Sequence, residues 1–191
     1  MATVPLSELH ARLRLATKAL HHLLDHHPVV APLVRDDLTL EHYGDALAAL
    51  HGIYAPLEAG IDDFLKTTPG LFDYHPRRKL PALQDDLARL GRRPGSRQLD
   101  YSAPTTIPEL VSVLYTVEGT TLGGQHILRC LRQRAFDNLP MRFFNGYGEQ
   151  TAARWSEFLA FADRVCPPAD HRLAEEAAVA LFQGVKTYLD G

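Results

Sequence analysis

Hydrophobic residues recur at helical spacing along most of this chain. Near the N-terminus, one apolar stripe joins residues three or four positions apart: Leu6, Leu9, Leu13, Ala16, Leu20 and Leu24. The stripe ends before Pro28, so the pattern predicts a first helix over about residues 7–27. Thr39 is a suitable N-cap for a long second helix, which we expect to continue to about residue 67 and to bend at Pro56.

The rest of the chain has the same periodicity, with turn residues between the helical stretches. The pattern predicts further helices over about 77–90, 107–134, 148–165 and 170–189, with an irregular connection over 135–147. No stretch alternates between apolar and polar residues as a half-buried strand does. We therefore expect an all-α, single-domain fold of about six to eight helices that covers residues 1–191.

Composition narrows the possible classes of protein. Of the 191 residues, 46% are hydrophobic and 23% are charged, which is ordinary for a globular protein. The net charge of −3 argues against nucleic-acid binding, which requires a basic surface. We find no apolar run long enough to cross a membrane and no signal-peptide pattern, so we expect a cytoplasmic protein. Cys130 and Cys166 lack the spacing of a metal site and fit a reducing compartment.

One predicted helix carries glycines where helix-forming residues would be expected. Residues 117–126 read VEGTTLGGQH, which places Gly119, Gly123 and Gly124 inside a helical pattern. Each interior glycine costs about 1 kcal/mol relative to alanine, so the three together cost about 3 kcal/mol. Two explanations are open: tight packing against another helix, or close approach of the backbone to a flat ligand.

Helical phase separates the histidines of the first predicted helix. His21 lies four residues after Thr17 and three before Leu24, at the edge of the apolar stripe. His22 lines up with Lys18 and His26 in a polar row that faces water. Five other histidines fall at positions that we expect on the surface or in loops: His26, His27, His42, His75 and His171. An inward histidine can be a ligand or a hydrogen-bonded core residue, and no H-E-x-x-H pattern indicates a zinc hydrolase.

Several segments of the chain, in order, resemble those of the heme oxygenase family, especially its small bacterial branch. The segment LRLATKALHHLLD is similar to the family's first-helix motif, whose proximal histidine stands four residues after a threonine and therefore corresponds to His21. HGIYAPLEAGI resembles the second-helix segment that carries a distal tyrosine, here Tyr54. YTVEGTTLGGQ resembles the distal-helix signature. The resemblance implies a helical fold that holds heme b between the first helix and a glycine-kinked distal helix.

The same resemblance implies the residues of the site. His21 would be the iron ligand, and Gly119, Gly123, Thr120 and Tyr54 would act in catalysis on the distal side. The expected heme-binding residues are His21, Arg14, Thr17, Lys18, Gly119, Gly123, Gly124, Arg129, Arg132 and Phe182, with Phe143 and Lys186 as weaker candidates. Many family members have an aspartate after the first distal glycine, where this chain has Thr120. Ordered water near Thr120 would then deliver protons, while Glu118 is expected to face solvent or a neighbouring helix and His126 to point away from the iron.

The implied reaction opens heme with O2 and electrons to biliverdin, carbon monoxide and ferrous iron. The implied partners are heme, O2 and an electron donor such as a ferredoxin or a similar reductase system, and the product could supply a photoreceptor. No nucleic-acid or membrane partner is expected. Two alternatives remain: a heme-binding or heme-delivery protein of the same fold, and another enzyme of similar fold, such as a thiamine-degrading one. The second lacks support, because neither cysteine sits in a suitable constellation.

Overall fold

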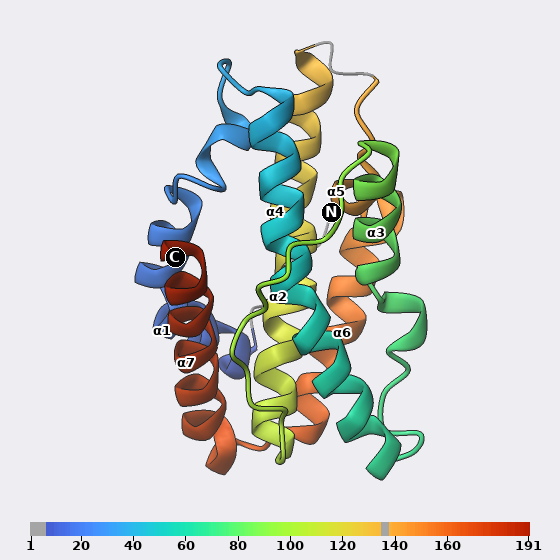
Figure 1. Ribbon diagram of the computed structural model, residues 1–191. Coiled ribbons are helices and arrows are strands. Elements are labelled where there is room, and N and C mark those ends of the chain that lie inside the picture. The colour runs from blue at the N-terminus through green and yellow to red at the C-terminus, as the bar shows by residue number, and fades with distance from the viewer. Residues whose placement is uncertain (1–6, 135–137) are drawn as a thin grey trace.

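The computed structural model describes residues 7–134 and 138–191, and all regular secondary structure in this part is helical (Figure 1). The α-helices are α1 (Glu8–Asp25), α2 (Leu40–Thr67), α3 (Leu80–Arg89), α4 (Ile107–Gln133), α5 (Arg142–Asn145), α6 (Thr151–Val165) and α7 (His171–Asp190). The 3-10 helices η1 (Ala31–Val34), η2 (His75–Arg77), η3 (Gly148–Gln150) and η4 (Pro168–Asp170) lie between them. No strand occurs in the described residues, so the predicted all-α class is confirmed. Leu6 and residues 135–137 lie outside the described part.

Side-chain caps explain where three of the longer helices begin. The hydroxyl oxygens of Ser7, Thr39 and Thr106 each accept a hydrogen bond from the backbone N–H three residues later, at 3.2, 3.1 and 3.4 Å. At α4 the Glu109 side chain also bonds the Thr106 backbone N–H at 3.0 Å, which completes a capping box. The predicted N-cap at Thr39 is therefore confirmed.

Pro56 lies inside α2, and the helix continues through it. Proline has no N–H, so it leaves the carbonyl of Gly52 without its helical partner. The backbone N–H of Leu99 bonds this carbonyl instead, at 2.9 Å. A Cβ at Gly52 would lie 2.6 Å from the carbonyl oxygen of Arg97, so the close approach requires glycine. The connection between α3 and α4 is thus tied to the middle of α2, whose axis changes direction along its length (Figure 1).

The predicted helix over 77–90 is two elements, η2 and α3. The carboxylate of Glu58 on α2 accepts hydrogen bonds from the backbone N–H groups of Lys79 and Leu80, at 2.5 and 3.3 Å. These bonds satisfy donors that open the first turn of α3, and Pro81 follows within that turn. The sequence pattern missed this break because Glu58 is remote in sequence. Similarly, η3 precedes α6, η4 precedes α7, and the irregular 135–147 connection contains α5.

The helix α4 runs through the middle of the bundle, where it contacts α2, α5, α6 and α7 (Figure 1). Every residue from 110 to 118 is buried, so this half of α4 is enclosed on all sides. Burial falls at Gly119, and Thr120 and Gly123 are exposed. The surroundings of α4 therefore change at the first glycine of the predicted distal segment.

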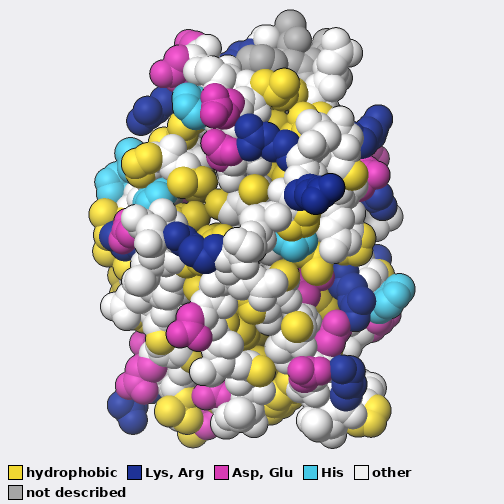
Figure 2. Space-filling view, in the orientation of Figure 1, with side chains coloured by type: hydrophobic (Ala, Val, Ile, Leu, Met, Phe, Trp, Pro, Cys, Tyr) yellow, Lys and Arg dark blue, Asp and Glu magenta, His cyan; other side chains and the backbone are white. Residues whose placement is uncertain are grey.

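The outer surface carries both signs of charge. On the face drawn in Figure 2, acidic and basic side chains are interspersed. Among the described residues, none of the helices is both long enough and apolar enough to span a bilayer. Cys130 and Cys166 are both free thiols.

Candidate functional site

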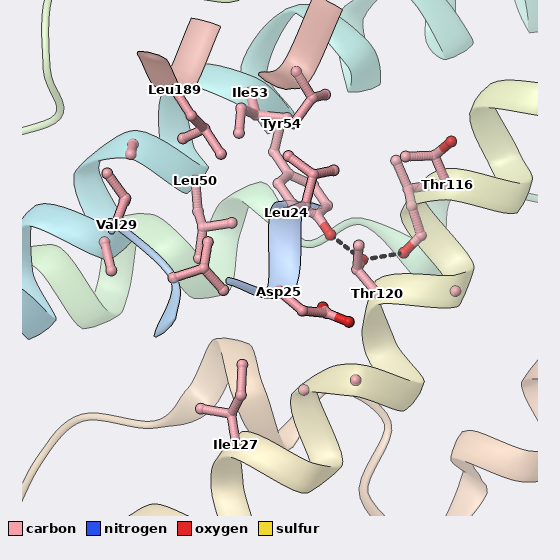
Figure 3. Close-up of a pocket in the computed structure, with 18 of the residues that line it drawn as sticks. Leu24, Asp25, Val29, Leu50, Ile53, Tyr54, Thr116, Thr120, Ile127 and Leu189 are labelled. Atoms are coloured by element: carbon pink, nitrogen blue, oxygen red, sulfur yellow. Dashed lines mark hydrogen bonds between the residues drawn. The ribbon is translucent and has the colours of Figure 1, made fainter. Parts of the chain in front are cut away.

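A cavity of about 320 Å³ lies between α1, α2, α4 and α7, with η1 and α5 closing its sides. Most of its lining is hydrocarbon. Figure 3 shows several of these apolar side chains, which come from four helices and the segment before η1: Leu24, Val29, Leu50, Ile53, Ile127 and Leu189. A partly open apolar pocket with few polar groups suits a large hydrophobic ligand.

His21 lines this cavity from α1. Its half-buried imidazole packs edge-on against the ring of Phe182, with the ring centroids 4.5 Å apart. Burial lowers the pKa of His21, and the carboxylate of Asp25 opposes this shift more weakly. The imidazole is therefore neutral near pH 7, which is the form that can ligate a metal.

Asp25 also lines the cavity, one helical turn after His21. In Figure 3 its carboxylate extends from the end of α1 into the space that Thr120 faces from α4. The sequence pattern did not lead us to select Asp25, although its spacing of four residues from His21 places both on one face of α1. Helical phase was the signal that could have found it.

Gly119, Gly123 and Gly124 line the cavity from α4. None of them has a positive φ, so backbone conformation does not require glycine at these positions. A Cβ on Gly123 would meet no atom within 4 Å, and a Cβ on Gly119 would meet only Trp155, at 3.9 Å. On Gly124 the nearest atom would be the carbonyl oxygen of Phe144, at 3.4 Å. Helix packing therefore does not require glycine at 119 and 123, whereas Gly124 is buried against the backbone of Phe144 on α5.

Tyr54 and Thr120 place two hydroxyl groups at the same wall (Figure 3). Thr120 donates to the carbonyl oxygen of Val117 at 3.0 Å and is hydrogen-bonded to the Tyr54 hydroxyl. Burial raises the pKa of Tyr54, so its phenol keeps its proton. The hydrogen bonds then run in one direction, from Tyr54 to Thr120 to the Val117 carbonyl.

Phe143 and Phe144 form another part of the wall, and α5 carries both. Phe143 packs edge-on against Tyr54, with the ring centroids 5.3 Å apart. A helix of four residues cannot stabilise itself, and Asp86 on α3 holds its start. The two oxygens of the fully buried Asp86 carboxylate accept hydrogen bonds from the backbone N–H groups of Arg142 and Phe143, at 3.0 and 2.8 Å.

Glu118, directly before the first distal glycine, is almost fully buried. It accepts hydrogen bonds from Arg77 on η2 at 3.0 Å and from the hydroxyl of Tyr147 at 2.8 Å. The ammonium group of Lys79 lies 3.4 Å from the same carboxylate. The prediction allowed solvent or a neighbouring helix around Glu118. The side chain does not face solvent, because Arg77 on η2 and Lys79 contact it and are themselves buried. The ion cluster fixes α4 at the point where its glycine segment begins.

Comparisons with known proteins show the family of this chain. The family model described as heme oxygenase matches residues 7–187. The chain belongs to the heme oxygenase family. It is 29% identical over 151 residues to a heme oxygenase of Xanthomonas campestris, a match that covers 77% of this chain and 88% of that one.

Solved heme oxygenases also share the fold. The enzyme of Neisseria meningitidis, with NO and CO bound, has a TM-score of 0.75 at 20% identity and covers 95% of this chain and 89% of its own. The Leptospira interrogans enzyme has a TM-score of 0.77 at 16% identity, with coverages of 96% and 98%. Heme oxygenase-1 of the cyanobacterium Synechocystis, in complex with heme, has a TM-score of 0.73 at 16% identity, with coverages of 96% and 91%.

The cavity brings together only some of the residues that the family resemblance selected. His21, Tyr54, Gly119, Thr120, Gly123, Gly124, Phe143 and Phe182 line it. Arg14, Lys18, Arg129 and Arg132 are exposed and lie outside the lining, and Lys186 pairs with Asp190 at 2.6 Å. Thr17 also lies outside, because its fully buried hydroxyl donates to the carbonyl of Leu13 at 2.8 Å.

Two of the histidines that were expected on the surface or in loops are buried. His27 is buried and lies 3.4 Å from the carboxylate of Asp190 on α7, and its other ring nitrogen accepts from the Val29 N–H at 3.2 Å. His171 is also buried, at the start of α7. His27 lies in the connection between α1 and η1, which is one of the two settings predicted for it. The prediction for His171 was wrong, because this residue begins α7 and its Nδ1 lies 3.9 Å from the Glu8 carboxylate of α1. His126 is exposed and lies outside the cavity lining.

Proposed function

We propose that this chain is a heme oxygenase that opens heme b to biliverdin, carbon monoxide and ferrous iron, with His21 as the iron ligand. The observation that carries the proposal is that one apolar cavity is lined by a neutral imidazole on α1 and by three glycines on α4. Bound heme supplies the iron that takes up O2 and the ring that is opened. The family supports the reaction class, and the cavity supports the roles proposed for His21, Tyr54 and Thr120.

The residues of the cavity fit a flat, apolar macrocycle. The cavity lining is mostly hydrocarbon. Gly123 borders open space, and a side chain at this position would occupy part of the volume that the macrocycle needs. The imidazole of His21 is neutral and half-buried, which suits ligation of iron. The Asp25 carboxylate lies one turn away, where its negative charge stabilises positive charge on the imidazole.

On the distal side, the polar groups of the chain are hydroxyls. Tyr54 donates to Thr120, so the Thr120 oxygen is held at the cavity wall by two partners. Neither hydroxyl loses a proton near pH 7, and we propose that they hold water which carries protons to the site. Thr120 takes this role in place of the aspartate of many family members.

The exposed basic residues are proposed to bind the two propionates of heme. Arg14 and Lys18 on α1 and Arg129 and Arg132 on α4 are free to move toward a ligand, since all four are exposed. Arginine can bind a carboxylate through two parallel hydrogen bonds. The electron donor is proposed to be a ferredoxin or a similar reductase system, and the biliverdin is proposed to supply a photoreceptor.

Heme titration of the wild type and two variants tests the proposal. Wild type should bind one heme per chain with the spectrum of nitrogen-ligated iron, and should yield biliverdin when O2 and an electron donor are added. His21→Ala should lose that spectrum, whereas His22→Ala, which removes the adjacent exposed imidazole, should retain it. A retained spectrum in His21→Ala would remove the ligand assignment. Heme that stays intact through repeated turnover conditions would instead indicate a heme-binding or heme-delivery protein.

A further inference from the structure

Two exposed histidines, His22 and His26, lie one turn apart at the C-terminal end of α1. Their ring centroids are 4.3 Å apart, with an interplanar angle of 49°. Figure 2 shows histidine side chains gathered on the surface near this end of α1. Neither ring lines the heme cavity, so the proposed function gives these two residues no role.

The separation of the two rings is close to what shared coordination requires. Two imidazoles bound to one ion at about 2.1 Å, in adjacent coordination positions, have ring centres roughly 4.5–5 Å apart. The observed 4.3 Å is near this range, so small side-chain rotations would complete the site. Residues four apart on a helix hold this geometry without any loop that must first be ordered.

A hydrogen bond sets which nitrogen of His26 is free. Its Nδ1 lies 2.8 Å from the carbonyl oxygen of His22. A carbonyl oxygen only accepts, so Nδ1 carries the proton and Nε2 keeps its lone pair. Metal-ligating histidines commonly have their second nitrogen fixed in this way, which orients the ring and selects the tautomer.

The local charges favour a cation at this position. The helix α1 ends at Asp25, so the negative end of its dipole lies beside the two histidines, whereas the Asp25 carboxylate itself lines the cavity. The negative end of a helix dipole stabilises a positive charge placed beside it. Lys18, one turn before His22, opposes the cation, but its long exposed side chain can turn away.

The neighbouring histidines have other contacts. His21 packs on Phe182 in the cavity, and His27 pairs with Asp190. In the described part of the chain there is no cluster of three or more possible metal-ligating side chains. The protein therefore offers two ligands, and water would fill the remaining positions.

We propose that His22 and His26 form a surface site for a divalent transition-metal ion that prefers imidazole, such as Cu²⁺, Ni²⁺ or Zn²⁺. Such ions take neutral imidazole readily, and Cu²⁺ binds most tightly of the three. The site is separate from the heme cavity and does not depend on the proposed function. A second pair on α4 needs a control, since the Sγ of Cys130 lies 3.9 Å from Nε2 of His126.

Cu²⁺ titration of the full, untagged chain tests the site. The Cys130→Ser background excludes the thiol, and the electron paramagnetic resonance spectrum counts the nitrogen ligands. We expect one Cu²⁺ per chain with two imidazole nitrogens and a dissociation constant below about 100 μM. His22→Ala and His26→Ala should each weaken binding about tenfold or more, because a single imidazole lacks the gain in affinity that chelation by two imidazoles provides. His42→Ala removes an exposed histidine on α2 that has no histidine one turn away, and it should leave binding unchanged.

Equal affinities in His22→Ala and His42→Ala, or no binding tighter than about 1 mM in the background chain, would overturn the proposed site. The two proposals can fail separately. His21→Ala should lose the heme ligation spectrum and keep the Cu²⁺ spectrum, whereas His22→Ala should do the reverse. Loss of both spectra in one variant would show that the two sites are not distinct.

Discussion

The Tyr54 hydroxyl donates a hydrogen bond to the Thr120 hydroxyl at the wall of the cavity. Substitutions of the two residues leave different hydrogen bonds intact. Tyr54→Phe keeps the ring that packs on Phe143, and Thr120 keeps its bond to the Val117 carbonyl. Thr120→Val removes both bonds and leaves a buried phenol without a partner.

Thr120→Val should therefore destabilise the fold more than Tyr54→Phe. A lost hydrogen bond costs about 1 kcal/mol, whereas a buried unpaired hydroxyl adds a penalty of about 1–3 kcal/mol. Urea unfolding of the heme-free chain measures both values. Both variants should also slow biliverdin formation in a single turnover if the hydroxyls hold the proton-carrying water. A smaller loss of stability in Thr120→Val than in Tyr54→Phe would contradict a hydrogen bond that runs from Tyr54 to Thr120.

Gly123→Ala should change stability and heme affinity in opposite directions. The new methyl group meets no atom within 4 Å, so the helix gains about 1 kcal/mol in propensity without a clash. The same methyl projects into the cavity, so heme binding should weaken about tenfold, which corresponds to about 1.4 kcal/mol. Chemical unfolding and heme titration measure the two effects.

Gly184→Ala is the matched control for this pair of measurements. Gly184 lies inside α7, where a Cβ would make an ordinary contact with Leu99 at 3.7 Å. It does not line the cavity. The substitution should raise stability by a similar amount and leave heme affinity unchanged. If both alanines affected heme equally, the role of Gly123 at the cavity would be refuted.

Most of the fold was predictable because it follows from local patterns. The N-cap at Thr39, the apolar stripe of α1 and Pro108 in the first turn of α4 are read from a few neighbouring residues. The break before α3 was not predictable, because the carboxylate that caps this helix comes from Glu58, which lies 21 residues before Lys79. Local pattern sets where helices form, and remote side chains decide where some of them begin.

The candidate site divides in the same way. Helical phase and the family resemblance both selected His21. The distal glycines were noticeable because glycine inside a helix lowers helix stability. The wall formed by α5 had no local signal, because Asp86 fixes it from 56 residues away. Similarly, Val29 and Val30 reach the cavity only because the chain turns back after α1. A sequence pattern identifies groups with unusual chemistry more readily than the apolar walls that enclose them.

Asp86→Ala should loosen the α5 wall. The change leaves two backbone N–H groups without their acceptors, which costs about 2–3 kcal/mol in the free energy of unfolding. Phe143 would then lose its fixed position against Tyr54, and we expect heme to bind in a mixture of in-plane orientations. Paramagnetic NMR of the heme methyl groups resolves such a mixture.

The adjacent residue supplies the control for Asp86. Asp85 makes only a long ion pair with exposed Arg142, at 3.8 Å. Asp85→Ala should cost less than about 1 kcal/mol and leave the heme orientation unchanged. Equal losses of stability in the two variants would mean that the hydrogen bonds of Asp86 do not hold α5.

Acid should destabilise this fold partly through buried histidines. Burial lowers the pKa of His51, and neither of its ring nitrogens has a hydrogen-bond partner among the described residues. The unfolded chain then binds more protons than the folded chain once the pH falls below about 6.5, so stability decreases as the pH falls. One such residue contributes a slope of up to about 1.4 kcal/mol per pH unit. His10 and His21 have pKa shifts in the same direction.

His51→Leu isolates the contribution of one residue to this slope. Unfolding free energies of wild type and variant, measured by urea at several pH values from 7.5 to 5, should diverge below about pH 6.5, with the variant losing less stability. Burial raises the pKa values of Glu58 and Asp86, so these groups favour the folded state as they take up protons at lower pH. Both chains share that opposing effect, and it cancels in the difference. Parallel curves over the whole range would mean that folded His51 takes up its proton as readily as the unfolded chain does, contrary to its burial.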